Sequence, residues 1–255
     1  YYFIIRIKSQ LINYINKTIR KTVPVLLYHR IDKVSDDPVM LVVTPTTFEK
    51  HIEFINKFYK PISLSELVNR VDTKSLRGNE ICVTFDDGYR DNYMYSLPIL
   101  EKYNTPATIF ATTSNIGKRA SFNWDFKYRD AERAYFLSEE EIKILSNHPL
   151  IEIGAHTHKH LRLSDLTEKD QIAEIGISKK ILENIIGKKV LHFAYPFGSK
   201  HDFNDTSKRI VKDLGFISAY ENTGLLGTTS SDIYSFPRIN IRECDIKHFS
   251  KILLN

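Results

Sequence analysis

Residues 81–89, Ile-Cys-Val-Thr-Phe-Asp-Asp-Gly-Tyr, form a short apolar run that ends in two adjacent carboxylates. An apolar run of this length before a glycine is typical of a buried strand in a parallel sheet. Asp86 and Asp87 would then lie at the carboxyl end of the strand, where the active sites of parallel α/β folds collect. Adjacent carboxylates repel each other and lose solvation, and a cation beside them would relieve both costs. Taken alone, the stretch also fits an ordinary Asp-Asp-Gly turn.

Apolar runs alternate with helical patterns along the rest of the chain. Further strands are predicted over 23–28, 107–111, 151–155, 190–195, 216–220 and 234–241. The predicted helices include one capped by Thr46 or Thr47, one around 93–100, one opened by the capping box Ser138-x-x-Glu141, one opened by Thr167, and one near 204–214. This alternation indicates a mostly parallel sheet covered by helices. About seven strands fall short of a regular eightfold barrel. We therefore predict an α/β fold, a distorted (β/α) barrel formed as a single domain by residues 23–255.

Residues 1–22 are expected to form a separate basic amphipathic helix. Its apolar residues recur at helical spacing, and no acidic residue precedes Asp32. Such a helix suits an anionic membrane surface through residues 1–20, and it equally suits packing against the domain. The chain starts without Met, so a removed signal or anchor stays an open alternative.

Composition excludes some other classes of function. Lys and Arg number 36 against 31 Asp and Glu, a net charge of +5, and no base-reading motif accompanies this small excess. We therefore expect no nucleic-acid partner. Cys82 and Cys244, the only cysteines, provide neither a disulfide framework nor a cysteine zinc cluster.

A second polar group follows the predicted strand 151–155. His156 and His160 are four residues apart, a spacing that places two imidazoles on one face of a helical turn. With one carboxylate they would form a two-histidine, one-aspartate site with coordination positions left for water and substrate. His158, between them, is expected to point elsewhere.

These two groups together resemble the polysaccharide deacetylase family, the NodB-homology group of carbohydrate esterase family 4. Thr84-Phe85-Asp86-Asp87-Gly88 is similar to its first motif, and His156-Thr157-x-x-His160 is similar to its second. The resemblance implies that Asp86 is the general base and that Asp87, His156 and His160 bind one divalent metal ion. Zinc is the expected ion, and cobalt, nickel or manganese also suit this ligand set.

Tyr195-Pro196-Phe197-Gly198 resembles the third motif, which forms one wall of the substrate groove and offers a backbone N–H to the oxyanion. Many members carry an arginine there that steadies the base, whereas this chain has Phe193-Ala194. Arg238 is the candidate substitute, and we include it with Tyr195, Pro196 and Phe197 among the predicted substrate-binding residues.

The expected proton donor also departs from the usual pattern. Family members usually carry Leu-x-His near the C-terminus, where this chain has only His248 without the leucine. Leu27-Tyr28-His29 has the required pattern near the other end. This resembles the circularly permuted poly-N-acetylglucosamine deacetylase branch, so His29 is the predicted acid and His248 the alternative. A histidine that merely caps a strand would also fit.

Residues 113–137 lack a clear period and are rich in aromatic side chains. Such an insertion is either a sugar-binding loop or a local hydrophobic plug.

The predicted function is metal-dependent removal of N-acetyl groups from amino sugars of an N-acetylglucosamine-type glycan, at the cell envelope rather than free in the cytoplasm. The alternatives are a membrane enzyme acting on a lipid-linked amino sugar, a hydrolase of non-sugar amides, and an inactive carbohydrate-binding relative.

Overall fold

A computed structural model describes residues 22–33, 36–120, 122–128 and 134–253. Its centre is a parallel sheet with the strand order β10-β1-β5-β6-β7-β8-β9. These strands are β1 (Val25–Tyr28), β5 (Glu80–Phe85), β6 (Ala107–Ala111), β7 (Ile151–Ala155), β8 (His192–Ala194), β9 (Ser218–Tyr220) and β10 (Ile239–Asn240). Beside β5 lies β4 (Lys60–Pro61), and β2 (Arg30–Ile31) pairs with β3 (Val42–Val43) in a separate small parallel sheet.

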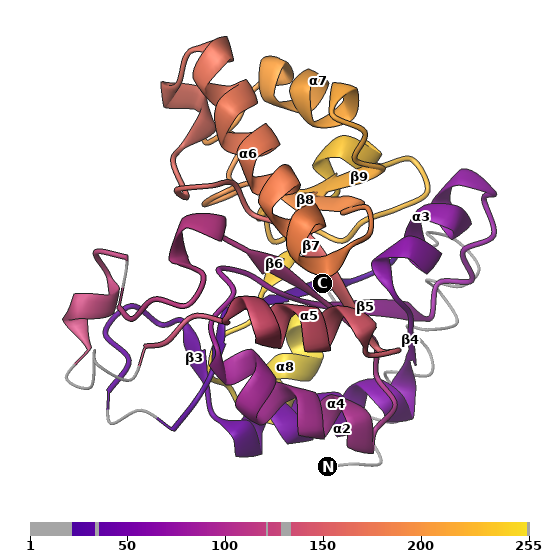
Figure 1. Ribbon diagram of the computed structural model, residues 1–255. Helices are drawn as coiled ribbons and strands as arrows, with labels where there is room; N and C mark the ends of the chain where they lie inside the picture. Colours follow the sequence, from indigo (N-terminus) through magenta and orange to yellow (C-terminus); the bar gives the residue numbers. More distant parts are fainter. Residues whose placement is uncertain (1–21, 34–35, 121, 129–133, 254–255) are drawn as a thin grey trace.

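Helices follow most of the strands, as the alternating pattern predicts. They are α2 (Pro45–Phe58), α3 (Leu64–Asp72), α4 (Leu97–Lys102), α5 (Glu139–Asn147), α6 (Glu168–Ile186), α7 (Asp205–Asp213) and α8 (Ile246–Ile252). A π-helical turn, η2 (Asn92–Ser96), leads directly into α4. Figure 1 shows α6 and α7 above the strands and α2, α4 and α8 below them. All six residues of β5 are buried because helices cover the sheet.

The sheet curls into a barrel whose first and last strands meet. β1 pairs in parallel with β10, with Leu26 opposite Ile239 and Leu27 opposite Asn240. The segment just before β10 completes the barrel. Its Phe236 forms a parallel bridge to Tyr220 at the end of β9. The fold is therefore the predicted distorted (β/α) barrel in a single domain.

Several predicted boundaries are confirmed and others are wrong. β6 and β7 have the predicted limits, Thr167 caps α6, and both hydrogen bonds of the Ser138–Glu141 capping box are present. The cap of α2 is Thr44 rather than Thr46 or Thr47, because Pro45 already occupies the first helical turn. The strand predicted over 234–241 contracts to β10, since residues 233–235 form a 3-10 turn, η7 (Ile233–Ser235), ahead of Pro237.

The predicted N-terminal helix, apart from its last residue, lies outside the described residues. Among the described residues, none of the helices combines the length and apolar character needed to span a bilayer.

Candidate active site

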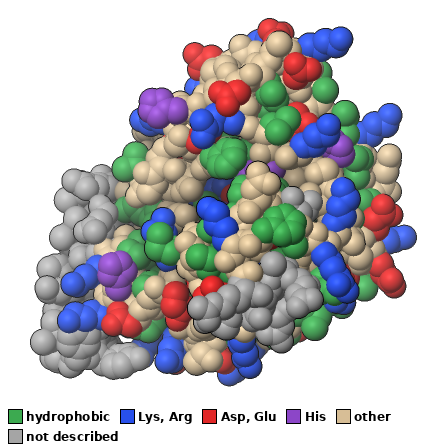
Figure 2. Space-filling view, turned by 90° about the vertical axis from the view of Figure 1, so that its left-hand side faces the viewer, with side chains coloured by type: hydrophobic (Ala, Val, Ile, Leu, Met, Phe, Trp, Pro, Cys, Tyr) green, Lys and Arg blue, Asp and Glu red, His purple; other side chains and the backbone are tan. Residues whose placement is uncertain are grey.

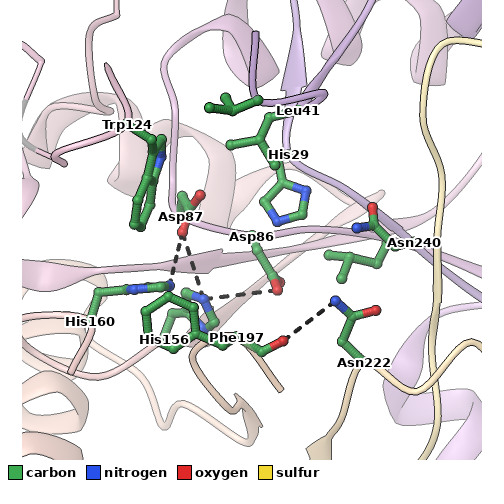
Figure 3. A pocket seen from close by; sticks show the side chains of 12 residues that line it. His29, Leu41, Asp86, Asp87, Trp124, His156, His160, Phe197, Asn222 and Asn240 are labelled. Carbon is green, nitrogen blue, oxygen red and sulfur yellow. Dashed lines mark hydrogen bonds and ion pairs between the residues drawn. The ribbon is translucent and has the colours of Figure 1, made fainter. Parts of the chain in front are cut away.

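The predicted site residues meet because parallel strands present their carboxyl ends at one edge of the barrel. Asp86 and Asp87 follow β5, His156 follows β7, and His29 follows β1. They enclose a cavity of about 300 Å³. Its lining comprises Leu27, His29, Val39, Leu41, Asp86, Asp87, Trp124, His156, His160, Phe197, Asn222 and Asn240 (Figure 3).

Asp87 and the two histidines face one another at the floor of this cavity. His160 Nε2 lies 3.4 Å and His156 Nε2 lies 3.7 Å from Asp87 Oδ1, and all three side chains are buried. His156 Nδ1 contacts the carbonyl oxygen of Ala194 at 2.8 Å, which leaves Nε2 directed at the cavity. A carbonyl partner on one ring nitrogen is the usual way in which a metal-binding histidine is oriented.

The segment from His156 to His160 is a loop, so the predicted helical turn is wrong. Thr157 and His160 have left-handed φ angles of 61° and 58°. The Thr157 hydroxyl oxygen accepts a hydrogen bond from the His160 backbone N–H, and this bond holds the loop in its bent form. His158 Nδ1 contacts the hydroxyl of Thr113 at 2.9 Å, so this side chain does point away from the cavity.

A second bend displays the two carboxylates. Asp87 and Gly88 have left-handed φ angles of 73° and 80°. Two features favour glycine at position 88. Its φ angle is left-handed, and a Cβ atom there would lie 3.1 Å from Cβ of Ala111. The chain therefore turns sharply at the end of β5, and both Asp86 and Asp87 line the cavity.

The electrostatics of Asp87 and its histidines fit a divalent cation. Burial and the neighbouring Asp86 raise the pKa of Asp87 well above its usual value. Burial lowers the pKa of both His156 and His160, which keeps their imidazoles neutral and able to donate a lone pair. Asp87 Oδ1 is buried and accepts no hydrogen bond from the described part of the chain. A bound cation would give this oxygen a partner, and the three ligand atoms lie within 4.8 Å of one another.

Asp86 has a different environment from its neighbour. Arg238 donates to both of its carboxylate oxygens, each at 2.7 Å, and both side chains are buried. Burial by itself would raise the pKa of Asp86, but the charges of Arg238 and His156 outweigh it and lower the pKa. The expected contact between Arg238 and Asp86 is therefore present.

His29 lies across the cavity from the histidine pair, whereas His248 is exposed on α8. Loss of solvation lowers the pKa of His29 to about 4, although Asp86 opposes this effect. The His29 ring is thus neutral at pH 7, before any substrate enters.

The third motif contributes less to the cavity than predicted. Phe197 lines it and is 45% exposed, with a left-handed φ of 61°. Tyr195 and Pro196 are buried, and the Tyr195 hydroxyl donates to the carbonyl oxygen of Tyr234. Arg238 is fully buried against Asp86. Of these four predicted substrate-binding residues, only Phe197 therefore reaches the cavity.

The aromatic insertion contributes both to a buried cluster and to the wall of the cavity. Tyr89, Phe122 and Phe136 form a buried cluster, and the hydroxyl of Tyr89 donates to Asp125 at 2.6 Å. Trp124 donates from Nε1 to this same hydroxyl at 3.0 Å, and its ring lines the cavity. Figure 2 shows the side of the molecule that lies at the left in Figure 1. Hydrophobic and basic side chains are interspersed on this surface.

Four lining residues were not predicted from the sequence: Val39, Leu41, Asn222 and Asn240. The first three lie in loops without a recognisable pattern. Asn240 alone carried a signal, since it is two residues after Arg238 and so on the same face of an extended segment.

Comparison with known proteins agrees with this geometry. Similar proteins include the "Putative polysaccharide deacetylase YxkH" of Bacillus subtilis (strain 168), 28% identical over 86% of this chain and 71% of that protein. The poly-beta-1,6-N-acetyl-D-glucosamine N-deacetylase of Staphylococcus aureus (strain MSSA476) is 26% identical over 82% of this chain and 71% of that protein.

A similar fold occurs in the solved structure of the Streptococcus pyogenes deacetylase PplD in complex with acetate. The TM-score is 0.74 at 23% identity, covering 87% of this chain and 92% of that chain. Residues 73–219, more than half of the sequence, match the family described as polysaccharide deacetylase. The chain therefore belongs to the polysaccharide deacetylase family.

Proposed function

We propose that this protein is a metal-dependent deacetylase that releases acetate from N-acetylated amino sugars of a poly-N-acetylglucosamine-type glycan. The observation that supports the proposal is the buried Oδ1 of Asp87, which accepts no hydrogen bond from the described residues and faces His156 and His160 at the cavity. A structural role for Asp87 alone would leave this oxygen without compensation.

Asp87, His156 and His160 are the proposed metal ligands. A divalent cation at this position would acidify a water molecule and polarise the acetamide carbonyl. Zinc suits two imidazoles and a carboxylate, and cobalt, nickel and manganese remain alternatives.

The remaining roles belong to the residues around the proposed ligands. Asp86 accepts the proton of the attacking water, and Arg238 holds its carboxylate in one orientation. A backbone N–H near Phe197 stabilises the oxyanion. His29 delivers a proton to the departing sugar nitrogen. Because its own pKa is low, His29 is neutral beforehand, and the proton that it delivers is the one that Asp86 takes from the attacking water.

The similarity to a poly-beta-1,6-N-acetyl-D-glucosamine deacetylase supports an amino-sugar polymer as substrate. Trp124 and Phe197 offer aromatic surface for the apolar faces of sugar rings. We propose that the enzyme acts at the cell envelope, because its relative's substrate is a glycan polymer.

Acetate release after chelation, followed by single-metal restoration, tests the proposal. We expect the chelated protein to lose activity towards oligomers of β-1,6-linked N-acetylglucosamine and to regain it with one metal equivalent. Asp86→Asn should abolish release while the protein still binds metal. Full activity in the chelated protein would disprove the metal-dependent reaction.

A further inference from the structure

Two amides, Asn222 and Asn240, line the cavity, and in Figure 3 Asn240 lies beside His29 whereas Asn222 lies beside Phe197. Asn240 lies in β10 directly opposite Leu27 of β1, and Leu27 also lines the cavity. Partners in a parallel ladder project to the same face of the sheet, whereas Ile239 and Ile241 project to the buried face. The barrel seam therefore fixes the direction of the Asn240 side chain.

The carbonyl oxygen of this side chain is an unused acceptor. Asn240 Oδ1 is buried and receives no hydrogen bond from the residues that the structure describes. Asn222 differs, because it has no buried side-chain atom without a partner, and its Nδ2 donates to the carbonyl oxygen of Phe197 at 3.4 Å. Since buried polar atoms nearly always have partners, an unpartnered acceptor at a cavity wall indicates a donor on the ligand.

The position of Asn240 identifies that donor. His29, the proposed acid, must face the nitrogen that leaves the acetyl group, and Asn240 lies beside the His29 ring (Figure 3). A scissile acetamide has one N–H at that nitrogen, whereas an O-acetyl ester has none at the corresponding oxygen. The other donors of an amino sugar, its hydroxyl groups, lie farther from the bond that breaks.

We propose that Asn240 accepts a hydrogen bond from the N–H of the scissile acetamide and thereby makes the enzyme selective for N-acetyl over O-acetyl groups. This inference rests on the proposed deacetylase function. When water attacks the carbonyl carbon, the nitrogen becomes pyramidal and its lone pair must turn towards the acid. An N–H anchored on Asn240 directs that lone pair to His29, which protonates the nitrogen as the C–N bond breaks.

The test uses two matched substrates and two variants. The substrates are an oligomer of β-1,6-linked N-acetylglucosamine and the same oligomer with 2-O-acetyl in place of 2-acetamido groups. Asn240→Leu removes the acceptor with little change in shape, whereas Asn240→Asp retains one. We expect Asn240→Leu to lower kcat/KM for the amide roughly 10–100-fold more than for the ester. Asn240→Asp should retain more of the amide selectivity.

The ratio of kcat/KM for the amide to kcat/KM for the ester, measured on one preparation, does not depend on the fraction of protein that is folded. Asn222→Leu serves as the control and should leave this ratio unchanged. If Asn240→Leu lowers kcat/KM equally for the amide and the ester, the inference is overturned. Such a result would mean that Asn240 shapes the cavity or holds His29, because either role affects both leaving groups. A wild-type protein that cleaves neither substrate would instead overturn the proposed function itself.

Discussion

Replacing Arg238 by Met should destabilise the protein by about 3–5 kcal/mol, the usual cost of leaving one partner of a buried ion pair alone. Arg238 makes two hydrogen bonds of 2.7 Å to Asp86. The two side chains are only 1% and 5% exposed, so water cannot replace the lost donors. Arg238 also donates to Thr84 Oγ1 and to the carbonyl oxygen of Glu221, which adds to the cost.

A double-mutant cycle with Asp86→Asn measures the coupling between Arg238 and Asp86. Each single variant leaves one buried charge without its partner, whereas the double variant removes both charges. We therefore expect the double variant to lose at least ~2 kcal/mol less than the sum of the two single losses.

Urea unfolding followed by circular dichroism at pH 7.5, with chelator present, gives the four free energies without a contribution from metal. The m values must agree among the variants for the comparison to hold. Losses that add within about 0.5 kcal/mol would refute the coupling. Arg238 would then not be the residue that holds Asp86 in place.

Three further predictions concern other parts of the molecule. Burial lowers the pKa of His51 from 6.5 in the unfolded chain to about 4 in the folded protein. Unfolded protein therefore binds a proton at His51 more readily. The resulting stabilisation of about 3 kcal/mol is present above pH 6.5 and is lost as the pH falls towards 4. His51→Gln should flatten the pH dependence of urea unfolding over that range, and an unchanged slope would contradict the assignment. Trp124 is the single tryptophan, and its ring lies 5.4 Å from that of His160, so titration with cobalt should change its emission with one equivalent. The same titration of Asp87→Asn should show a weaker response, and equal responses would place the metal elsewhere. His29→Gln should slow acetate release by roughly 10²–10⁴-fold while His248→Gln stays near wild type, and the reverse order would exchange their roles.

The sequence predicted the strands of this barrel better than the surfaces that complete its site. β6 and β7 could be delimited because both are short, mostly apolar segments in which all residues except Glu152 are buried. β10 could not, because only two residues keep strand pairing after the 3-10 turn. Short strands of this kind are fixed by their neighbours across the seam, and a periodicity search cannot detect them.

The histidine pair shows how a correct pairing can follow from a wrong local structure. Spacing of four residues suggested one face of a helix, yet His156 and His160 converge through left-handed residues at Thr157 and His160. A helix would fix the geometry by its own hydrogen bonds. This loop instead uses the Thr157 hydroxyl, so Thr157 has a part in the site that spacing alone does not reveal.

The barrel seam explains why the family resemblance was needed to propose His29 and Arg238, and why Asn240 was missed. Asp86 and Asp87 come from β5, which is next to β1, and β1 is next to β10. His29, Arg238 and Asn240 therefore reach the carboxylates only because the first and last strands pair. Each of these residues lies more than fifty positions from Asp86 in the sequence, and no local pattern relates them. The proposed acid, the arginine that orients the proposed base and the proposed acetamide acceptor thus depend on barrel closure. A change that loosens the pairing of β1 with β10 should weaken all three roles together while leaving the proposed metal ligands Asp87, His156 and His160 in place.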